Sequence, residues 1–179
     1  MRLARRLLSV ALLALTCAAG AQQVQPVARV DLVRYSGSWF EIARLPNRFQ
    51  TQCVANVSAE YVQRDDGQID VINRCLKADG SSDSAIGRAQ IVDAASNAKL
   101  KVRFAPVWLS WLPSVWGDYW VLDLATDYST AAVGEPSHKY LWILSRKRTM
   151  TDTQYQEIVQ RLAKQGYDTA ALVKTRQQP

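Results

Sequence analysis

The stretch Ser38-Trp39-Phe40-Glu41-Ile42-Ala43-Arg44-Leu45 lies between Gly37 and Pro46, two residues that commonly interrupt regular structure. It is the first of eight short runs in which apolar side chains recur with a period of two between clusters of turn residues. Runs of this kind are typical of an antiparallel β-sandwich or β-barrel. The runs are residues 38–45, 54–63, 68–77, 84–92, 99–104, 118–124, 130–134 and 139–146.

The connections between these runs alternate in length. Residues 65–67, 95–97 and 126–127 read as tight turns, and residues 46–52, 78–83, 105–117 and 135–138 read as longer loops. In an up-and-down meander every second turn lies at the same end of the sheet. We therefore predict an all-β fold: an eight-stranded antiparallel up-and-down β-barrel, closed at one end and open at a mouth rimmed by the longer loops.

One strongly helical segment follows the eighth run. Thr151 or Asp152 can cap its N-terminus, and we expect the helix to extend to Lys164, before Gly166. Its apolar stripe predicts a C-terminal α-helix packed on the outside of the barrel, and residues 167–175 are expected to form a short last strand at the sheet edge. The stripe consists of Tyr155, Ile158 and Leu162.

The N-terminus has the pattern of an export signal. A positively charged start is followed by the apolar residues 7–15 and by Ala19-Gly20-Ala21, which resembles a cleavage site. The apolar run is too short to span a bilayer, which needs about 20 residues. We expect residues 1–21 to be a signal peptide and residues 22–179 to form one domain.

Cys17 lies within this signal and offers an alternative. A bacterial lipoprotein carries a lipidated cysteine at such a position, and that cysteine becomes the new N-terminus. A small residue is expected directly before it, and Thr16 is bulkier. Cleavage after Ala21 and lipidation of Cys17 both stay open from the sequence.

The two remaining cysteines, Cys53 and Cys75, belong to a chain that we expect to enter an oxidising compartment. An even count there indicates one disulfide, with two free buried thiols as the alternative. Cys53 opens the second predicted strand and Cys75 nearly ends the third, so that a bridge between them would pin the two strands together near the mouth.

Charge and histidine content argue against several function classes. The formal net charge of the 179-residue chain is +6, but Lys and Arg are scattered rather than clustered, which gives nucleic-acid binding little support. His138 is the single histidine, so a metal site built from several histidines is excluded. A Ser-His-Asp triad would need this loop residue, and no nucleophile elbow is present. We expect no metal, no cofactor and no catalysis.

Three short motifs, distant in sequence, fall at the closed end of the predicted meander. They are Gly37-Ser38-Trp39 at the start of the first strand, Thr126-Asp127-Tyr128 in the turn after the sixth, and Arg146 at the end of the eighth. There the Trp39 indole can plug the barrel while the Arg146 guanidinium stacks on it, a cation–π contact of about 0.5 to 2 kcal/mol.

These motifs, in this order, resemble the three signature regions of the lipocalin family. Residues 37–49 and residues 140–146 resemble the bacterial, Blc-like outer-membrane lipoprotein branch of that family. The resemblance covers nearly the whole mature chain and implies that the motif residues have a structural role, closing the floor of a cup. It implies a protein that binds and stores or transports a fatty acid or lysophospholipid in the bacterial envelope, in the periplasm or attached to the outer membrane.

The loop at residues 105–117 is rich in tryptophan, although it is expected to lie at the mouth. Trp108, Trp111 and Trp116 lie in it, and Trp120 follows it. One interpretation is a lid that folds inward. The alternative is an interaction surface that contacts a membrane or a second copy of the chain, because indole rings favour the water–lipid boundary.

Candidate ligand contacts follow from strand alternation and from this loop. Aromatic side chains suit an acyl chain, and arginines at the rim could meet a carboxylate or phosphate, with solvated surface arginines as the alternative. An interaction protein using the tryptophan-rich loop, and an enzyme acting on the lipid through His138, are the rival functions. The candidate contacts are Trp39, Arg44, Arg48, Arg103, Trp108, Trp111, Trp120, Tyr140 and Trp142.

Overall fold

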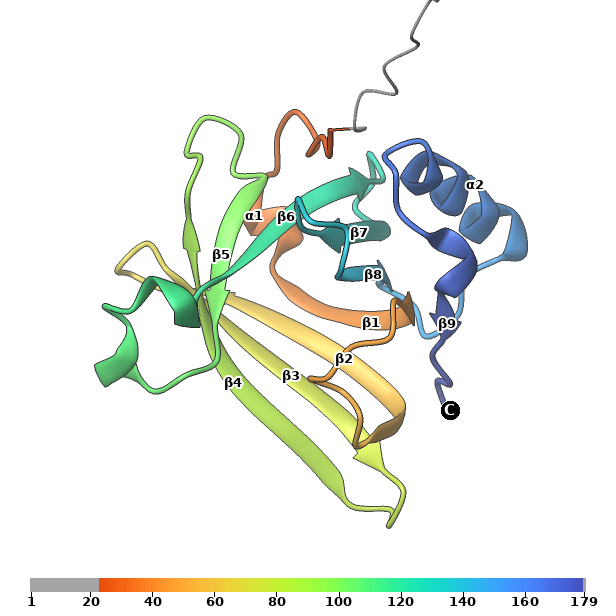
Figure 1. The fold of residues 1–179 in the computed structure, drawn as a ribbon, viewed down its shortest axis with the longest axis horizontal. Helices are drawn as coiled ribbons and strands as arrows, with labels where there is room; N and C mark the ends of the chain where they lie inside the picture. The colour runs from red at the N-terminus through yellow and green to blue at the C-terminus, as the bar shows by residue number, and fades with distance from the viewer. Residues whose placement is uncertain (1–22, 179) are drawn as a thin grey trace, which may run out of the picture.

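The structure is a computed structural model that describes residues 23–178, and these form a closed β-barrel (Figure 1). Each of the strands β1 to β8 is antiparallel to the next, and β1 also pairs with β8. The predicted eight-stranded up-and-down barrel is confirmed. The strands are β1 (Gly37–Arg44), β2 (Cys53–Gln63), β3 (Ile69–Lys77), β4 (Ser82–Ile91), β5 (Lys99–Arg103), β6 (Gly117–Leu124), β7 (Thr130–Gly134) and β8 (Leu141–Ser145).

Each strand begins and ends within two residues of its expected range, but two connections differ. The loop expected at residues 78–83 is a tight turn, because β4 already begins at Ser82 and the Lys77 N–H donates to the Ser81 carbonyl (2.9 Å). The tight turn expected at residues 95–97 belongs to a longer connection that starts after β4. The connections at the two ends of the barrel therefore differ less in length than predicted.

A short helix that the sequence pattern did not predict, α1 (Leu32–Tyr35), precedes β1 at the closed end. The Asp31 side chain caps it by accepting a hydrogen bond from the Val33 N–H (2.9 Å). The segment before it crosses the same end of the barrel, where the buried Val30 donates its N–H to the Ser96 carbonyl (2.7 Å). The N-terminal segment and α1 thus close the barrel from below.

β1 and β2 separate toward the mouth, and the C-terminal segment lies between them. Residues 37–40 of β1 pair with β2, whereas the end of β1 pairs with β9 (Val173–Lys174). Beyond β9, the Gln177 side-chain amide donates to the carbonyls of Glu41 in β1 and Val57 in β2, at 2.8 Å each. The last residues therefore bridge the two strands and complete the wall.

Helix α2 (Asp152–Ala163) packs on the outside of the barrel, as expected (Figure 1). Thr151 caps it through a capping box with Gln154. The buried stripe of α2 is Tyr155, Ile158 and Leu162, as predicted. The last strand is shorter than expected, because the 3-10 helix η3 (Thr169–Ala171) precedes β9.

Two further expectations concern membranes and export. In residues 23–178, no helix is long and apolar enough to cross a membrane. The expected signal peptide and Cys17 lie outside the described residues.

Candidate ligand-binding site

The floor of the barrel is a fully buried tryptophan beneath an arginine contact. Trp39 has no exposed surface, and its indole N–H donates to the Tyr35 carbonyl (2.8 Å). The guanidinium carbon of Arg146 lies 3.9 Å from the centre of the Trp39 ring. The predicted plug is therefore present. Trp39 packs under the Tyr35 ring, 5.0 Å away, so its role here is to seal the floor.

Arg146 also gathers the backbone around α1. Its guanidinium donates to the carbonyls of Arg34 (2.7 Å), Tyr35 (3.0 Å), Ser36 (2.9 Å) and Ser38 (2.8 Å). The last carbonyls of a helix lack partners within the helix, and a cation near them is favourable. Arg146 thus fixes α1 across the end of the barrel.

The third motif holds the same helix from the other side. The Asp31 N–H donates to the Tyr128 hydroxyl (2.8 Å), and the Arg34 guanidinium lies 4.0 Å above the Tyr128 ring. Arg34 also donates to the Thr126 carbonyl (3.0 Å). Asp127 shapes the turn by accepting hydrogen bonds from the N–H (2.9 Å) and hydroxyl (2.6 Å) of Ser129. The three motifs therefore meet at the floor, as predicted.

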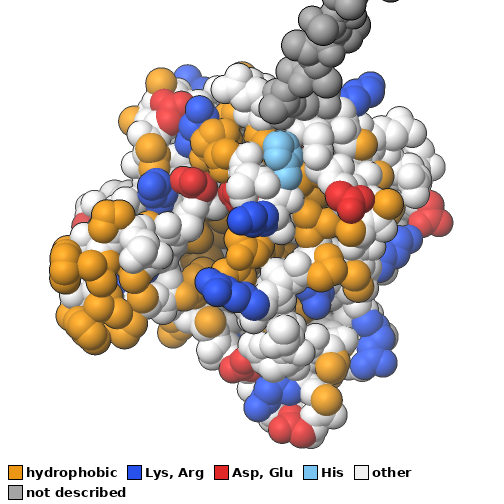
Figure 2. All heavy atoms as spheres, in the orientation of Figure 1, with side chains coloured by type: hydrophobic (Ala, Val, Ile, Leu, Met, Phe, Trp, Pro, Cys, Tyr) orange, Lys and Arg blue, Asp and Glu red, His pale blue; other side chains and the backbone are white. Residues whose placement is uncertain are grey.

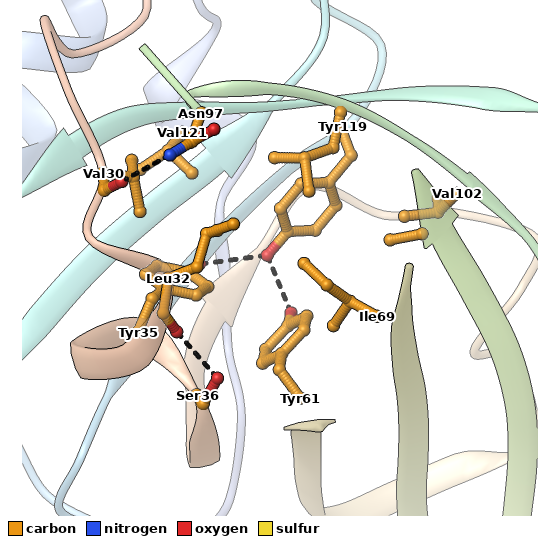
Figure 3. Close-up of a pocket in the computed structure, with 12 residues that line it drawn as sticks. Val30, Leu32, Tyr35, Ser36, Tyr61, Ile69, Asn97, Val102, Tyr119 and Val121 are labelled. Atoms are coloured by element: carbon orange, nitrogen blue, oxygen red, sulfur yellow. Dashed lines mark hydrogen bonds between the residues drawn. The ribbon is translucent and has the colours of Figure 1, made fainter. Parts of the chain in front are cut away.

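Above the floor, three tyrosines meet inside the barrel (Figure 3). We call Tyr35, Tyr61 and Tyr119 the tyrosine triad. The Tyr119 hydroxyl lies 3.0 Å from that of Tyr35 and 2.7 Å from that of Tyr61. They come from α1, β2 and β6, and sequence reasoning missed them as a group. Strand parity could have placed Tyr119 on the inner face with Val121, but nothing local indicates that three hydroxyls converge.

The triad lines an apolar cavity of ≈ 10 Å³, about the size of one water molecule. Burial raises the pKa of the Tyr61 hydroxyl to about 12 and raises the pKa values of Tyr35 and Tyr119 well above their ordinary value. All three hydroxyls are therefore protonated at neutral pH. The interior of the barrel is close to fully packed by its own side chains.

Aromatic side chains line one part of the mouth. Tyr140 stacks on Trp142, with ring centres 6.0 Å apart, and Phe49 lies 5.3 Å from Tyr140. The Trp142 indole N–H donates to the Gln50 side chain (2.8 Å). Trp142 packs against the inner core cluster. Two of the predicted contacts, Tyr140 and Trp142, thus lie together at the rim.

The predicted arginines have different surroundings. Arg44 forms an ion pair with the buried carboxylate of Glu41 (2.8 Å), which also accepts a hydrogen bond from Gln50 (2.7 Å). Arg48 is exposed and lies over the Phe49 ring, 5.3 Å from its centre. Of the two, Arg48 has its charge free of an ion pair among the described residues and is better placed to meet an anionic head group.

Trp120, expected on the inner wall, and Arg103, expected at the rim, both lie on the outer face of the barrel. Trp120 belongs to the outer cluster beneath α2, with the Lys99 ammonium 4.5 Å from its ring centre. Arg103 pairs in register with the outward-facing Arg88 and is buried under the Trp116 ring, 5.1 Å away. Alternation explains both, since Leu100, Tyr119 and Val121 occupy the inner face.

The tryptophan-rich loop extends outward rather than over the mouth. It contains the 3-10 helices η1 (Val107–Leu109) and η2 (Pro113–Val115) and lies on the side of the barrel away from α2 (Figure 1). Trp108 and Trp111 are 73% and 75% exposed. Figure 2 shows the hydrophobic side chains of this loop gathered on the surface. The inward lid is therefore not the arrangement found.

The two cysteines form the predicted disulfide. Cys53 at the start of β2 is bonded to Cys75 in β3, with Cα atoms 5.6 Å apart. The bridge links the strands on the mouth side of the barrel. Among residues 23–178, no group of His, Cys, Asp and Glu side chains is arranged to hold a metal ion.

Comparison with known proteins agrees with this architecture. The model of the lipocalin-like domain matches residues 30–177. The chain is 40% identical to temperature-induced lipocalin-1 of Arabidopsis thaliana over 87% of this chain and 84% of that protein. It is 36% identical to the outer membrane lipoprotein Blc of Escherichia coli K12, over 86% of this chain and 83% of that one.

Solved structures share the fold at lower identity. Insecticyanin from the tobacco hornworm Manduca sexta superimposes with a TM-score of 0.63 at 24% identity, over 85% of this chain and 83% of that one. Lobster apocrustacyanin A1 gives 0.64 at 17% identity, over 90% and 94% of the two chains. At these identities the likeness concerns the fold alone. The family model and the 40% identical relative together show that the chain belongs to the lipocalin family.

Proposed function

We propose that the protein binds a fatty acid or lysophospholipid, with its acyl chain inside the barrel and its head group at the rim, and catalyses no reaction. Lipocalin barrels hold one small ligand in their interior. The observation that carries the proposal is the floor: the buried Trp39, fixed by Arg146, gives an apolar interior with one open end. At that end Tyr140, Trp142 and Arg48 offer an aromatic and cationic rim.

Binding must move side chains in the interior. The cavity of ≈ 10 Å³ holds one water-sized molecule, whereas an acyl chain needs room for many methylene groups, each of about that size. The partly buried Leu32 and Val102 border the inner cluster and lie beside the cavity. We expect such side chains to change rotamer on binding, since the backbone ladder of the barrel holds its shape.

The cellular place that we propose is the bacterial envelope, in the periplasm or attached to the outer membrane. Its support is the export signal expected at residues 1–21, together with the names of the relatives called outer membrane lipoprotein Blc. Mass spectrometry of the mature N-terminus separates the two forms, because lipidation would begin the chain at Cys17 and cleavage after Ala21 would not.

Lipid binding is tested by displacement of a fluorescent fatty acid. We expect saturable binding at one site per barrel and displacement by both a fatty acid and a lysophospholipid. A probe that does not bind, or is displaced equally well by any detergent monomer, would contradict the proposal.

A second function is favoured by the exposed loop: we propose that it docks the protein on a lipid surface. Val107, Trp108 and Trp111 are each more than 70% exposed, and exposed apolar clusters of this kind mark interaction sites. Such docking would let a lipid pass into the mouth without crossing water.

Vesicle co-sedimentation of Trp108→Ser/Trp111→Ser tests this second function. Loss of sedimentation with retained binding of the fluorescent fatty acid supports it. Val33→Ser is the matched control, because Val33 is 76% exposed on α1 at the opposite end. Equal sedimentation of all three proteins would overturn it. A change in oligomeric state without any vesicle binding would assign the loop to a homodimer contact instead.

A further inference from the structure

The tyrosine triad contains more hydrogen-bond donors than it uses. Each phenol carries one proton, so the three hydroxyls have three donors. Two hydrogen bonds join them, Tyr35 to Tyr119 and Tyr119 to Tyr61, and each uses one proton whichever atom donates. Among the described residues these hydroxyls have no other partner, so one O–H donor is left over inside the barrel.

The surroundings of the triad do not supply an acceptor. The cavity beside it is lined mainly by aliphatic side chains such as Ile69, Leu100 and Val102 (Figure 3). Its two other polar side chains carry acceptor oxygens, but neither is hydrogen-bonded to a triad hydroxyl. The Ser36 hydroxyl donates to the Leu32 carbonyl (2.7 Å) and accepts from the Gln63 side chain (3.2 Å), and the Asn97 amide donates to the Val30 carbonyl (3.3 Å). A buried donor without a partner costs about 1–3 kcal/mol, so an acceptor placed there is favourable.

The charge around the triad selects the kind of acceptor. Arg146, the cation whose charge acts on Tyr35 and Tyr61, donates to four backbone carbonyls and stacks on Trp39. A carboxylate placed at the triad would therefore find no cation free of other partners among the described residues, and burial, which outweighs the attraction of Arg146 at Tyr35 and Tyr61, would disfavour its charge. A ketone, aldehyde or ester oxygen can accept the proton without carrying a charge inward.

We infer that the tyrosine triad is a subsite for a neutral carbonyl oxygen at the buried end of the ligand. The inference rests on the proposed function, since it assumes that an acyl chain enters the barrel. The ligand would then have two polar groups: a charged head group at the rim and an uncharged hydrogen-bond acceptor near the far end of its acyl chain. Oxygenated acyl lipids are then preferred over simple saturated fatty acids.

A matched pair of probes tests this. One is a saturated long-chain fatty acid, and the other is the same acid with a ketone on its penultimate carbon. The chain length of the pair is varied, so that at one length the ketone reaches the triad while the carboxylate stays at the rim. We expect the keto acid to bind about three- to tenfold more tightly, the range left after desolvation of the ketone offsets part of the hydrogen bond.

The number of hydroxyl donors also predicts how Tyr→Phe variants of the triad should behave. A single Tyr61→Phe leaves two hydroxyls joined by one hydrogen bond, hence still one spare proton, and should keep the preference for the keto acid. Tyr35→Phe/Tyr61→Phe/Tyr119→Phe removes every donor while keeping the rings, and should reverse the preference, because the ketone is then buried without a partner. The near-ultraviolet circular dichroism of each variant reports whether it is folded.

The outcomes separate the two proposals. If wild type binds both acids equally, the carbonyl subsite is wrong, an ordered water being the acceptor, and lipid binding stands. If neither acid binds, the proposed function fails and this inference fails with it. A preference that persists in the folded triple variant also overturns the triad assignment. Should that variant not fold, the infrared carbonyl band of the keto acid on wild type decides: a shift to lower frequency than in alkane supports the hydrogen bond, and an unshifted band contradicts it.

Discussion

The guanidinium carbon of Arg146, just after the last barrel strand, lies 3.9 Å from the ring centre of Trp39 in the first. Four backbone carbonyls around α1 accept hydrogen bonds from the same guanidinium. One side chain thus joins the first strand, the last strand and the helix that closes the barrel. The floor is held by this convergence rather than by packing alone.

Replacing Arg146 by lysine should weaken the floor. An ammonium cannot reproduce the planar stacking or reach four carbonyls in one geometry. We expect Arg146→Lys to lower the free energy of unfolding by about 2–3 kcal/mol, measured by urea denaturation. Arg148→Lys is the control, because Arg148 is exposed and lies 4.7 Å over the Phe40 ring, and it should change stability by less than about 0.5 kcal/mol. Equal effects of the two changes would contradict this role of Arg146.

The wall between β1 and β2 depends on the C-terminal segment. Gln177→Ala removes both hydrogen bonds that the side chain gives to these strands. We expect a loss of about 1–2 kcal/mol and faster amide hydrogen exchange near the end of β1. Gln178→Ala, whose backbone N–H still reaches Asn56, should leave both measurements unchanged. Unaltered amide exchange in the Gln177 variant would show that the wall between β1 and β2 holds without this side chain.

Glu135 in the loop between β7 and β8 makes the free energy of unfolding depend on pH. Burial alone would raise the pKa of the Glu135 carboxyl, but hydrogen bonds from Ser137, Lys139 and Tyr140 outweigh it and hold the pKa below its ordinary value of 4.5. A lowered pKa in the folded state contributes stability above the unfolded value, and this is lost as pH falls through the folded pKa.

The variant Glu135→Gln tests that pH dependence. We expect it to be about 1–3 kcal/mol less stable than wild type near neutral pH, because the amide cannot accept the same set of hydrogen bonds. The difference should shrink as the pH falls below 4.5, since wild type loses its contribution there. The exposed Glu157→Gln on α2 is the control and should show a small difference at every pH. A pH-independent gap for Glu135→Gln would refute the assignment.

The disulfide should contribute to stability by restricting the unfolded chain. It closes a loop with a sequence separation of 22 residues. We expect Cys53→Ser/Cys75→Ser to lower the free energy of unfolding by about 3 kcal/mol. Wild type under reducing conditions should behave as the double variant does. A reduced protein as stable as the oxidised one would show that strand pairing alone fixes this side of the mouth.

The strands and the floor could be predicted because both correspond to local patterns in the sequence. Period-two runs set the strand limits within two residues, and the Trp39 and Arg146 motifs fall at strand ends that a meander must bring together. Helix α1 has four residues, too few for a helical period to show. Alternation alone does not say which face of a strand is the inner one, and Trp120, expected inside, lies in the outer cluster beneath α2.

The tyrosine triad could not have been read from any one segment. Its members come from a helix and two strands that are not neighbours in the barrel, and their hydroxyls meet only because long side chains reach the same point in the interior. The same holds for the outward course of the tryptophan-rich loop, which depends on how Trp116 packs over the buried Arg103. The triad and the course of this loop both depend on burial and on the pairing of segments that are distant in the sequence.

Mass spectrometry of the ligand that co-purifies with the full chain under native conditions is the most direct test of the central claim. The account predicts one bound acyl lipid per barrel, released by organic extraction. It further predicts that species with a neutral carbonyl far from the charged head group are enriched over their simple saturated counterparts in the same extract. Extracts free of lipid, from protein that also fails to bind a fluorescent fatty acid, would contradict it.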